Sequence, residues 1–278
     1  MSLPVTIADK GHSVHLKWHR ARRFATDPVF TGTRILEGLR AGASVEVDIV
    51  LDATDGMVIL HNEVLSEETT GRGLVRETSP DVLRQLHLRG NDGTPLDERV
   101  MLLDDLVVLL DGGEIHPDAL LQLDLKENLA ALSPRAARRF RETLQPVARH
   151  VVLSGGDAAA VRLLARDLPG LMVGYDPCHE GAIERLRATW DFAAFTARAV
   201  GEVPEAKIIY LDHQLVLSAA AAGHDLVAAC HAAGKRVDAY TINTADARGM
   251  DLIRRLVSLK VDQITTDDPE GVAARWGT

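Results

Sequence analysis

The amino-acid sequence has little of what several large classes of protein depend on. Aromatic residues make up only 4% of its 278 residues, which argues against a surface that stacks bases or sugars. Its two cysteines, Cys178 and Cys230, are too few for a disulfide framework and are typical of buried thiols in a reducing cytoplasm. No stretch approaches the ~18 consecutive apolar residues of a membrane-spanning helix. We therefore expect neither a membrane span nor a disulfide-rich fold.

Positive charge is also scarce. The 31 Lys and Arg residues stand against 40 Asp and Glu residues, so the formal net charge is −9. Because nucleic-acid binding needs an extended basic surface, a nucleic-acid partner is not expected. The first ten residues lack the basic and apolar regions of a secretory signal, which favours a cytoplasmic location. A site for one small anion stays open, provided that a metal or a few placed cations offset the global repulsion.

The remaining composition is that of a globular protein, with 46% apolar and 26% charged residues. Short apolar segments alternate with longer amphipathic ones, which predicts strands followed by helices. The predicted strands cover 14–18, 44–51, 119–125, 150–154, 171–175, 207–211, 236–242 and 261–266. Predicted helices cover 31–41, 102–111, 134–146, 157–167, 180–200, 217–233 and 245–258.

Eight strand–helix units in this length favour a closed (β/α)8 TIM barrel, an α/β fold, occupying one domain over residues 1–278. An open parallel sheet is the alternative, but no Gly-rich nucleotide-binding pattern follows any strand. One extra strand is predicted at 57–60. The turn at Asp55-Gly56 is too short for a crossover helix, so this strand forms an antiparallel hairpin with 44–51. Residues 62–100 are turn-rich and predict a loop excursion with one short helix near 80–87.

Functional side chains of such a barrel collect at the carboxyl ends of its strands. Glu46 and Asp48 are two residues apart on one strand, so both project from the face that lines the barrel. With the hairpin turn near Thr54, residue 61 lies opposite about residue 47. His61 is therefore expected beside the two carboxylates, although it is 13 residues beyond Asp48.

The same spacing recurs on the next strand with Asp124 and Lys126, and a His-Arg pair ends the first strand. The candidate set consists of the carboxylates Glu46, Asp48 and Asp124, the cations Arg20 and Lys126, and the imidazoles of His19 and His61. Carboxylate oxygens suit a hard divalent ion, Mg²⁺ or Ca²⁺. Arginine and lysine suit a phosphate, and histidines suit general acid and base catalysis. Together these residues predict metal-assisted cleavage of a small phosphodiester.

The order of these motifs resembles that of the glycerophosphodiester phosphodiesterases, over residues 13–275. The matching segments are His19-Arg20, Glu46-Val47-Asp48, His61-Asn62, Asp124-Leu125-Lys126 and Thr266-Asp267-Asp268-Pro269. Tyr240 stands where the family commonly has tryptophan and is a candidate substrate contact, or a residue that only fills the barrel mouth. The resemblance implies a TIM barrel, one divalent metal, and cleavage of a glycerophosphodiester to glycerol phosphate and an alcohol.

Several positions depart from the family pattern, including the Glu-Asn-Thr segment of the first helix, which Thr31-Gly32-Thr33 replaces. Ala21 replaces a glycine, Asn62 replaces an aspartate and Asp124 replaces a glutamate. An Asp-x-Lys motif is also seen in the related sphingomyelinase D group. Two alternatives therefore stay open: a phospholipase D-like activity on lysolipids, and a catalytically silent barrel that binds phosphate ligands. The sequence leaves open the alcohol, the choice between Mg²⁺ and Ca²⁺, the acid and base roles of the histidines, and the oligomeric state.

Other polar residues at strand ends are interpreted as structural. Asp267 is expected to form a turn that closes the barrel. Cys178 and His179, which follow Asp176, have no apparent ordered partner. Ser154 is taken to lead into a helix capped by Asp157.

Overall fold

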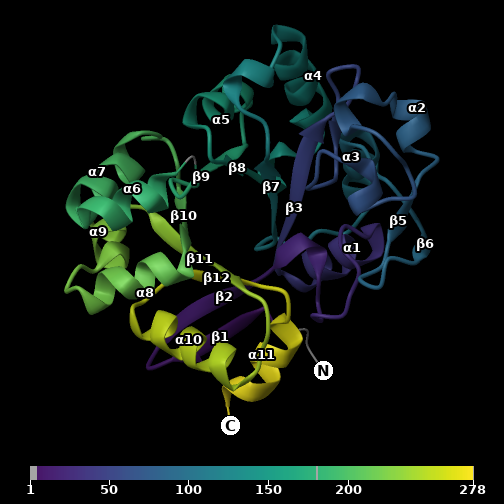
Figure 1. Cartoon of the computed structure of the whole chain (residues 1–278). Helices are drawn as coiled ribbons and strands as arrows, with labels where there is room; N and C mark the ends of the chain where they lie inside the picture. The colour runs from purple at the N-terminus through teal and green to yellow at the C-terminus, as the bar shows by residue number, and fades with distance from the viewer. Residues whose placement is uncertain (1–4, 180, 278) are drawn as a thin grey trace.

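The computed structural model describes residues 5–179 and 181–277, and it confirms the closed barrel. The barrel strands are β2 (His12–Trp18), β3 (Ser44–Leu51), β7 (Leu120–Leu125), β8 (Val151–Gly155), β9 (Met172–Tyr175), β10 (Ile208–Asp212), β11 (Arg236–Ile242) and β12 (Gln263–Thr266). They are hydrogen-bonded in parallel in the order β2-β12-β11-β10-β9-β8-β7-β3, and β3 pairs back with β2. Figure 1 looks along this barrel. The assignment of one domain to residues 1–278 stays a prediction.

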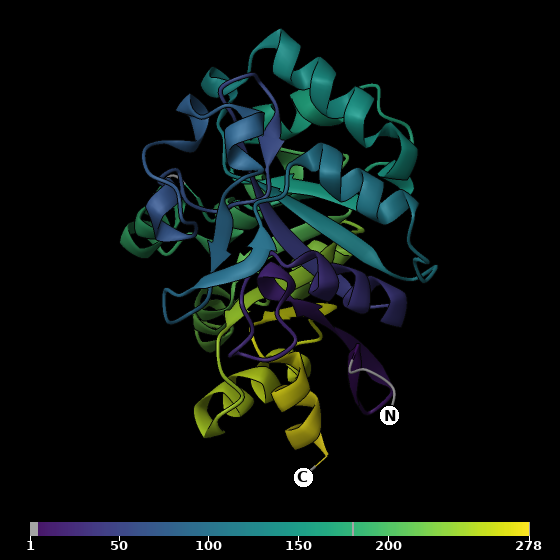
Figure 2. The same ribbon diagram turned by 90° about the vertical axis from the view of Figure 1, so that its right-hand side faces the viewer.

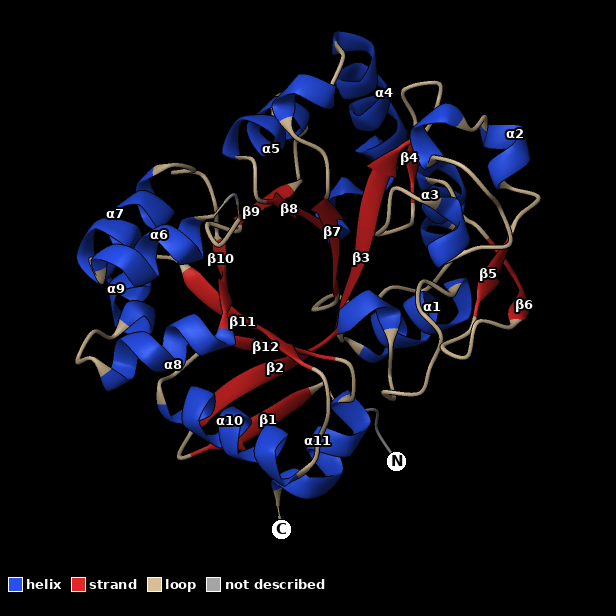
Figure 3. Cartoon of the chain, viewed as in Figure 1, coloured by secondary structure: helices blue, strands red, loops and turns tan. Residues whose placement is uncertain are grey.

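Helices surround the strands, as the blue and red ribbons of Figure 3 show. They are α1 (Gly32–Ala41), α3 (Leu103–Asp111), α4 (Pro134–Leu144), α5 (Ala158–Ala165), α6 (Ala182–Thr189), α7 (Phe192–Gly201), α8 (His213–Ala221), α9 (Leu226–Ala232), α10 (Ala247–Ser258) and α11 (Pro269–Trp276). Val45, Val47 and Ile49 on β3 are completely buried. A Cβ at Gly38 of α1 would lie 2.6 Å from Val45 Cγ2, so the helix can approach β3 this closely only with glycine there. Because these three residues face the helices, Glu46 and Asp48, which alternate with them on β3, are directed into the barrel.

The loop excursion starts from the predicted hairpin. β4 (Met57–Val58) is antiparallel to β3, with Val58 opposite Val50, and is two residues shorter than predicted. The excursion, which faces the viewer in Figure 2, holds α2 (Pro80–Leu83) and the antiparallel pair β5 (His87–Arg89) and β6 (Pro95–Arg99). The β5–β6 pair was not predicted because β6 is polar and mostly exposed, without alternation of apolar and polar residues.

Further differences from the prediction lie where two helices are interrupted and near the two ends of the chain. The predicted helix 180–200 is two helices, because Trp190 has a left-handed φ of 54° and Asp191 caps α7. The predicted helix 217–233 divides into α8 and α9 around Gly223, which has a φ of +84°. β1 (Thr6–Asp9), antiparallel to β2, and α11 were not predicted. In the described ranges no single helix is long and apolar enough to cross a membrane; α8 and α9 together are, but they meet at 101°.

Candidate active site

A cavity of about 170 Å³ opens at the carboxyl ends of the barrel strands. The structure brings all eight predicted site residues to its lining: His19, Arg20, Glu46, Asp48, His61, Asp124, Lys126 and Tyr240. Period-two alternation on β3 and β7 directs the carboxylates inward, and the β3–β4 hairpin returns His61 to the same place. The cavity therefore brings together predicted side chains that are up to 221 positions apart in sequence, from His19 to Tyr240.

Three buried carboxylates form the floor of this cavity. One oxygen from each of Glu46, Asp48 and Asp124 lies within 4.8 Å of the other two. Burial, followed by repulsion from the neighbouring carboxylates, raises the pKa of Glu46, and the same causes raise the pKa of Asp48 to about 7. Burial also acts to raise the pKa of Asp124, but the Lys126 ammonium outweighs it and lowers that pKa to about 2.

The same carboxylates have the chemistry of a divalent-cation site. Asp48 Oδ2 is buried and, among the described residues, accepts no hydrogen bond, although Arg20 Nε lies 3.3 Å away. A buried carboxylate oxygen without a donor is costly, and a hard cation would satisfy it. Three oxygen ligands and buried negative charge therefore fit Mg²⁺ or Ca²⁺.

Two cations border the carboxylates. Lys126 Nζ lies 2.8 Å from Asp48 Oδ1 and 2.5 Å from Asp124 Oδ2. Burial acts to lower the pKa of Lys126, but the surrounding carboxylates raise it, so the side chain stays an ammonium. The Arg20 backbone N–H donates to Glu46 Oε2 at 2.7 Å. Arg20 and Ala21 have φ values of 51° and 61°, so the chain turns left-handed where the family commonly has glycine at position 21.

The two predicted catalytic imidazoles have different partners. His19 Nδ1 lies 2.7 Å from Asp267 Oδ1, whereas His61 Nδ1 lies 2.8 Å from the side-chain oxygen of Asn62. The Glu68 carboxylate accepts the backbone N–H of both His61 and Asn62 at 2.9 Å, which holds this turn. A hydrogen bond at Nδ1 orients each ring and leaves Nε2 for proton exchange. The site therefore pairs one imidazole with a carboxylate and the other with a neutral amide.

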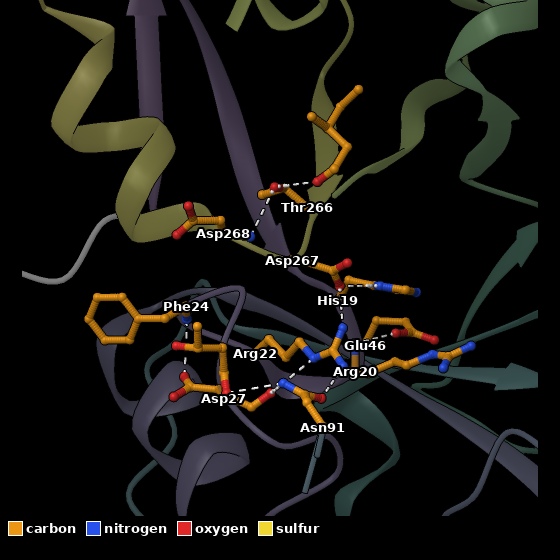
Figure 4. A network of polar contacts seen from close by, with 12 residues as sticks. His19, Arg20, Arg22, Phe24, Asp27, Glu46, Asn91, Thr266, Asp267 and Asp268 are labelled. Carbon is orange, nitrogen blue, oxygen red and sulfur yellow. Dashed lines mark hydrogen bonds and ion pairs between the residues drawn. The ribbon is translucent and has the colours of Figure 1, made fainter. Parts of the chain in front are cut away.

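Asp267 follows β12, where a strand-end turn was expected, and its carboxylate also contacts His19. Its carboxylate also lies 3.2 Å from Arg22 Nη1, and Arg22 Nη2 donates to Asn91 in the excursion at 2.9 Å (Figure 4). Burial opposes ionisation, but His19 and Arg22 lower the pKa of Asp267, which keeps it a carboxylate. Closure of the barrel pairs Thr266 on β12 with Trp18 on β2, so their successors are neighbours. The adjacency of the first and last strands in a closed barrel is the signal from which the contact between Asp267 and His19 could have been predicted.

The sequence analysis missed two further residues of the site. His179 Nε2 lies 2.8 Å from Asp176 Oδ2, and both line the cavity, so His179 does have an ordered partner. The hydrogen bond from His179 to Asp176 raises the pKa of this imidazole. The Ser154 hydroxyl donates to Asp124 Oδ1 at 2.6 Å, and Asp157 caps α5 as predicted. Ser154 therefore orients a carboxylate of the site as well as preceding a helix.

A comparison with protein families decides to which family this chain belongs. Residues 35–271 match the model of the glycerophosphoryl diester phosphodiesterase family. The chain belongs to this family. Membership makes the chain a phosphodiesterase. It agrees with the resemblance carried by the motifs from Glu46 onward, whereas His19-Arg20 precedes the matched range.

Other members and relatives are distant in sequence. The chain matches an uncharacterized Bacillus subtilis protein, YqiK, at 24% identity over 86% of this chain and 88% of that protein. A putative glycerophosphoryl diester phosphodiesterase from Silicibacter pomeroyi has 22% identity and a TM-score of 0.72, covering 96% of this chain and 94% of its own. An Oleispira antarctica phosphodiesterase, solved in complex with the product sn-glycerol-3-phosphate, has 20% identity and a TM-score of 0.63. The match covers 95% of this chain and 96% of the Oleispira chain. These structures share the barrel.

Proposed function

We propose that this phosphodiesterase is a metal-dependent hydrolase that cleaves a small glycerophosphodiester to glycerol phosphate and an alcohol. One observation carries the proposal: a single cavity is lined by the carboxylates of the metal-binding group, by the cations Arg20 and Lys126, and by the oriented imidazoles of His19 and His61. Binding of a glycerol phosphate product by the Oleispira relative supports the choice of substrate class.

Glu46, Asp48 and Asp124 would hold one divalent ion, Mg²⁺ or Ca²⁺. When bound, such an ion supplies Lewis-acid stabilisation of phosphoryl oxygens. Arg20 and Lys126 bind the phosphate and offset the charge that develops on it. Because Lys126 bridges Asp48 and Asp124, its ammonium is held in place before the substrate arrives.

His19 and His61 exchange protons with the attacking and leaving oxygens. Each ring is oriented through Nδ1, His19 by Asp267 and His61 by Asn62. One imidazole accepts the proton of the attacking hydroxyl while the other donates a proton to the leaving alcohol. Tyr240 lies at the rim of the cavity and contacts the substrate there.

A lysolipid substrate is less well supported. An acyl chain would favour an apolar rim on the excursion at 62–100. Of the large apolar side chains described as exposed, Val82 is the one that falls in this range, at 48% exposure. The excursion therefore offers no continuous apolar surface among the described residues, and the polar glycerophosphodiester is the better match.

Hydrolysis of a panel of glycerophosphodiesters tests the proposed function. The panel is assayed with EDTA, and again after Mg²⁺ or Ca²⁺ is restored. We expect release of glycerol phosphate that EDTA abolishes and one of these ions restores. If no substrate releases glycerol phosphate in the presence of metal, the phosphate-binding barrel without catalysis replaces this proposal.

Metal affinity is expected to depend on pH. Without a bound metal, burial and Glu46 raise the pKa of Asp48 to about 7, so the ligand is protonated below that pH and must lose its proton to bind. The affinity for Mg²⁺ should therefore fall up to about tenfold for each pH unit below 7 and level off above it. Calorimetric titration at pH 6, 7 and 8, in buffers of different ionisation enthalpy, measures the affinity and the protons released. Equal affinity for Mg²⁺ at all three pH values would contradict the coupling between metal binding and loss of the Asp48 proton.

A second pH effect follows from the neutral partner of His61. Asn62→Asp places a carboxylate at the ring that Asn62 now contacts at 2.8 Å. Because a carboxylate favours the protonated imidazole, the limb of the kcat/KM profile that reports His61 should move roughly one unit to higher pH. Movement of the alkaline limb identifies His61 as the acid, and movement of the acidic limb identifies it as the base. A profile with both limbs unchanged would remove His61 from proton transfer.

A further inference from the structure

A second cavity, of about 410 Å³, lies outside the barrel wall beside the catalytic cavity. It is formed by the start of α5, the loop after β9, and helices α6 and α7. Its volume is within the range of small-molecule sites, roughly 300–1,000 Å³. No residue that we have assigned to catalysis or metal binding lines this cavity, so the proposed reaction does not account for it.

Among the described residues, one side chain lines both cavities. His179 lines both of them and is held by Asp176 at 2.8 Å. A Cβ at Gly156 would lie 2.4 Å from His179 Cγ, so the absence of a side chain at position 156 is what lets this imidazole sit there. A substrate held by its phosphate in the catalytic cavity therefore places its alcohol half near His179, which also lines the second cavity.

The second cavity is rich in positive charge, although the whole chain has a net charge of −9. Its ionisable lining includes Arg162, Arg185, Arg198, Asp157 and Glu202. The two carboxylates are already engaged. Asp157 accepts the backbone N–H groups of Ala159, Ala160 and Leu129, at 2.9, 3.0 and 2.8 Å.

Glu202 is engaged in the same way, because it accepts the hydroxyl of Tyr175 at 2.6 Å. It does so although Arg198 precedes it by one helical turn on α7, where an ion pair would be expected. Among the described residues Arg198 has no ion-pair partner. Arg162 pairs with Glu205 at 2.9 Å, but both side chains are about half exposed, so this ion pair contributes little and can be exchanged for a ligand.

We propose that this cavity is a subsite for an anionic group, with phosphate the best match, on the alcohol half of the substrate. An arginine guanidinium can donate two parallel hydrogen bonds to one phosphate, and the presence of Arg198 and Arg162 on the lining of one cavity favours an anionic group there. The inference rests on the proposed function and deepens it: the preferred substrates are glycerophosphodiesters whose alcohol carries a phosphate of its own.

Two substrates that differ by one phosphate test the subsite. These are glycerophosphoinositol and glycerophosphoinositol 4-phosphate, assayed with the wild type, Arg198→Met and Arg187→Met. Arg187 is a matched control because it is exposed on α6 and lines a different cavity, beside Trp190. We expect the wild type to have the higher kcat/KM for the phosphorylated substrate. Arg198→Met should lower that value about tenfold or more and leave the other substrate unchanged.

The outcomes separate the subsite from the proposed function. Equal kcat/KM for both substrates in the wild type, or a preference that survives Arg198→Met, overturns the subsite but not the hydrolase. If neither substrate is cleaved, the hydrolase proposal fails on these substrates, and calorimetric titration with inositol 4-phosphate decides the subsite. Binding that weakens about tenfold in Arg198→Met and not in Arg187→Met supports it. Absent binding, or equal binding by the wild type and Arg198→Met, overturns it.

Discussion

Replacing His61 with alanine is expected to lower turnover by about 10²–10⁴-fold, the range for loss of a general acid or base. The ring lines the cavity of the three carboxylates and is oriented by Asn62 at 2.8 Å. Since its removal leaves the carboxylates in place, metal affinity and KM should change much less than kcat. Single-turnover and steady-state kinetics of the purified variant measure this separation. His19→Ala should have an effect of similar size, because its ring is held by Asp267 at 2.7 Å.

His87→Ala is the matched control. His87 is a half-buried histidine in the same excursion, and its Nδ1 contacts the backbone oxygen of Leu96 at 2.7 Å, away from the cavity lining. We expect this variant to retain wild-type turnover. If His61→Ala does the same, the imidazole has no part in proton transfer, and the acid and base must be sought among His19, His179 and water.

Replacing Lys17 with methionine is expected to cost about 3–5 kcal/mol of the free energy of unfolding, the range for removing one partner of a buried ion pair. Lys17 is 2% exposed and lies inside the barrel, with Nζ 3.0 Å from Asp238 Oδ2 and 4.3 Å from the centre of the Tyr210 ring. It also donates to Gln122. Without the ammonium, Asp238 would keep its hydrogen bonds from Gln263 and Thr265 but would be a buried charge with no cation. Denaturant titration measures the loss.

Two control variants separate the effect of the lost charge from the effect of the lost packing. The double variant Lys17→Met/Asp238→Asn removes both charges, so it should recover part of the stability lost by Lys17→Met alone. Arg255→Met removes one partner of an exposed ion pair, with Asp251 at 3.9 Å, and should change stability far less. A double variant less stable than Lys17→Met would show that the cost comes from lost packing or hydrogen bonds.

Part of the candidate site could be predicted because its signals are local. Glu46 and Asp48 are two positions apart, as are Asp124 and Lys126, so strand alternation alone places each pair on one face. The turn at Asp55-Gly56 sets the hairpin register, and Val58 does lie opposite Val50, which carries His61 back toward Glu46. In each case the inference spans fewer than 20 residues.

Other elements were missed where local patterning is weak. The polar strand β6 has no apolar face to reveal it, and β1 is only four residues long. The predicted helix at 180–200 was too long because a cap signal at Asp191 was not used, although its side chain accepts the Ala194 N–H at 2.9 Å. These errors concern where elements begin and end, and they leave the barrel unchanged.

Local sequence patterning was therefore enough for the eight-stranded barrel and for the face on which its carboxylates lie. The family followed from the resemblance in the order of the motifs along the chain. It was not enough for the partners that orient those groups. Asp267 reaches His19, and Asp238 reaches Lys17, only because closure of the sheet joins β12 to β2 and directs β11 side chains into the same interior. The second cavity likewise exists only once α5, α6 and α7 pack around the loop after β9. Contacts between residues more than 200 positions apart depend on the closure and packing of the whole barrel, and no local period encodes them.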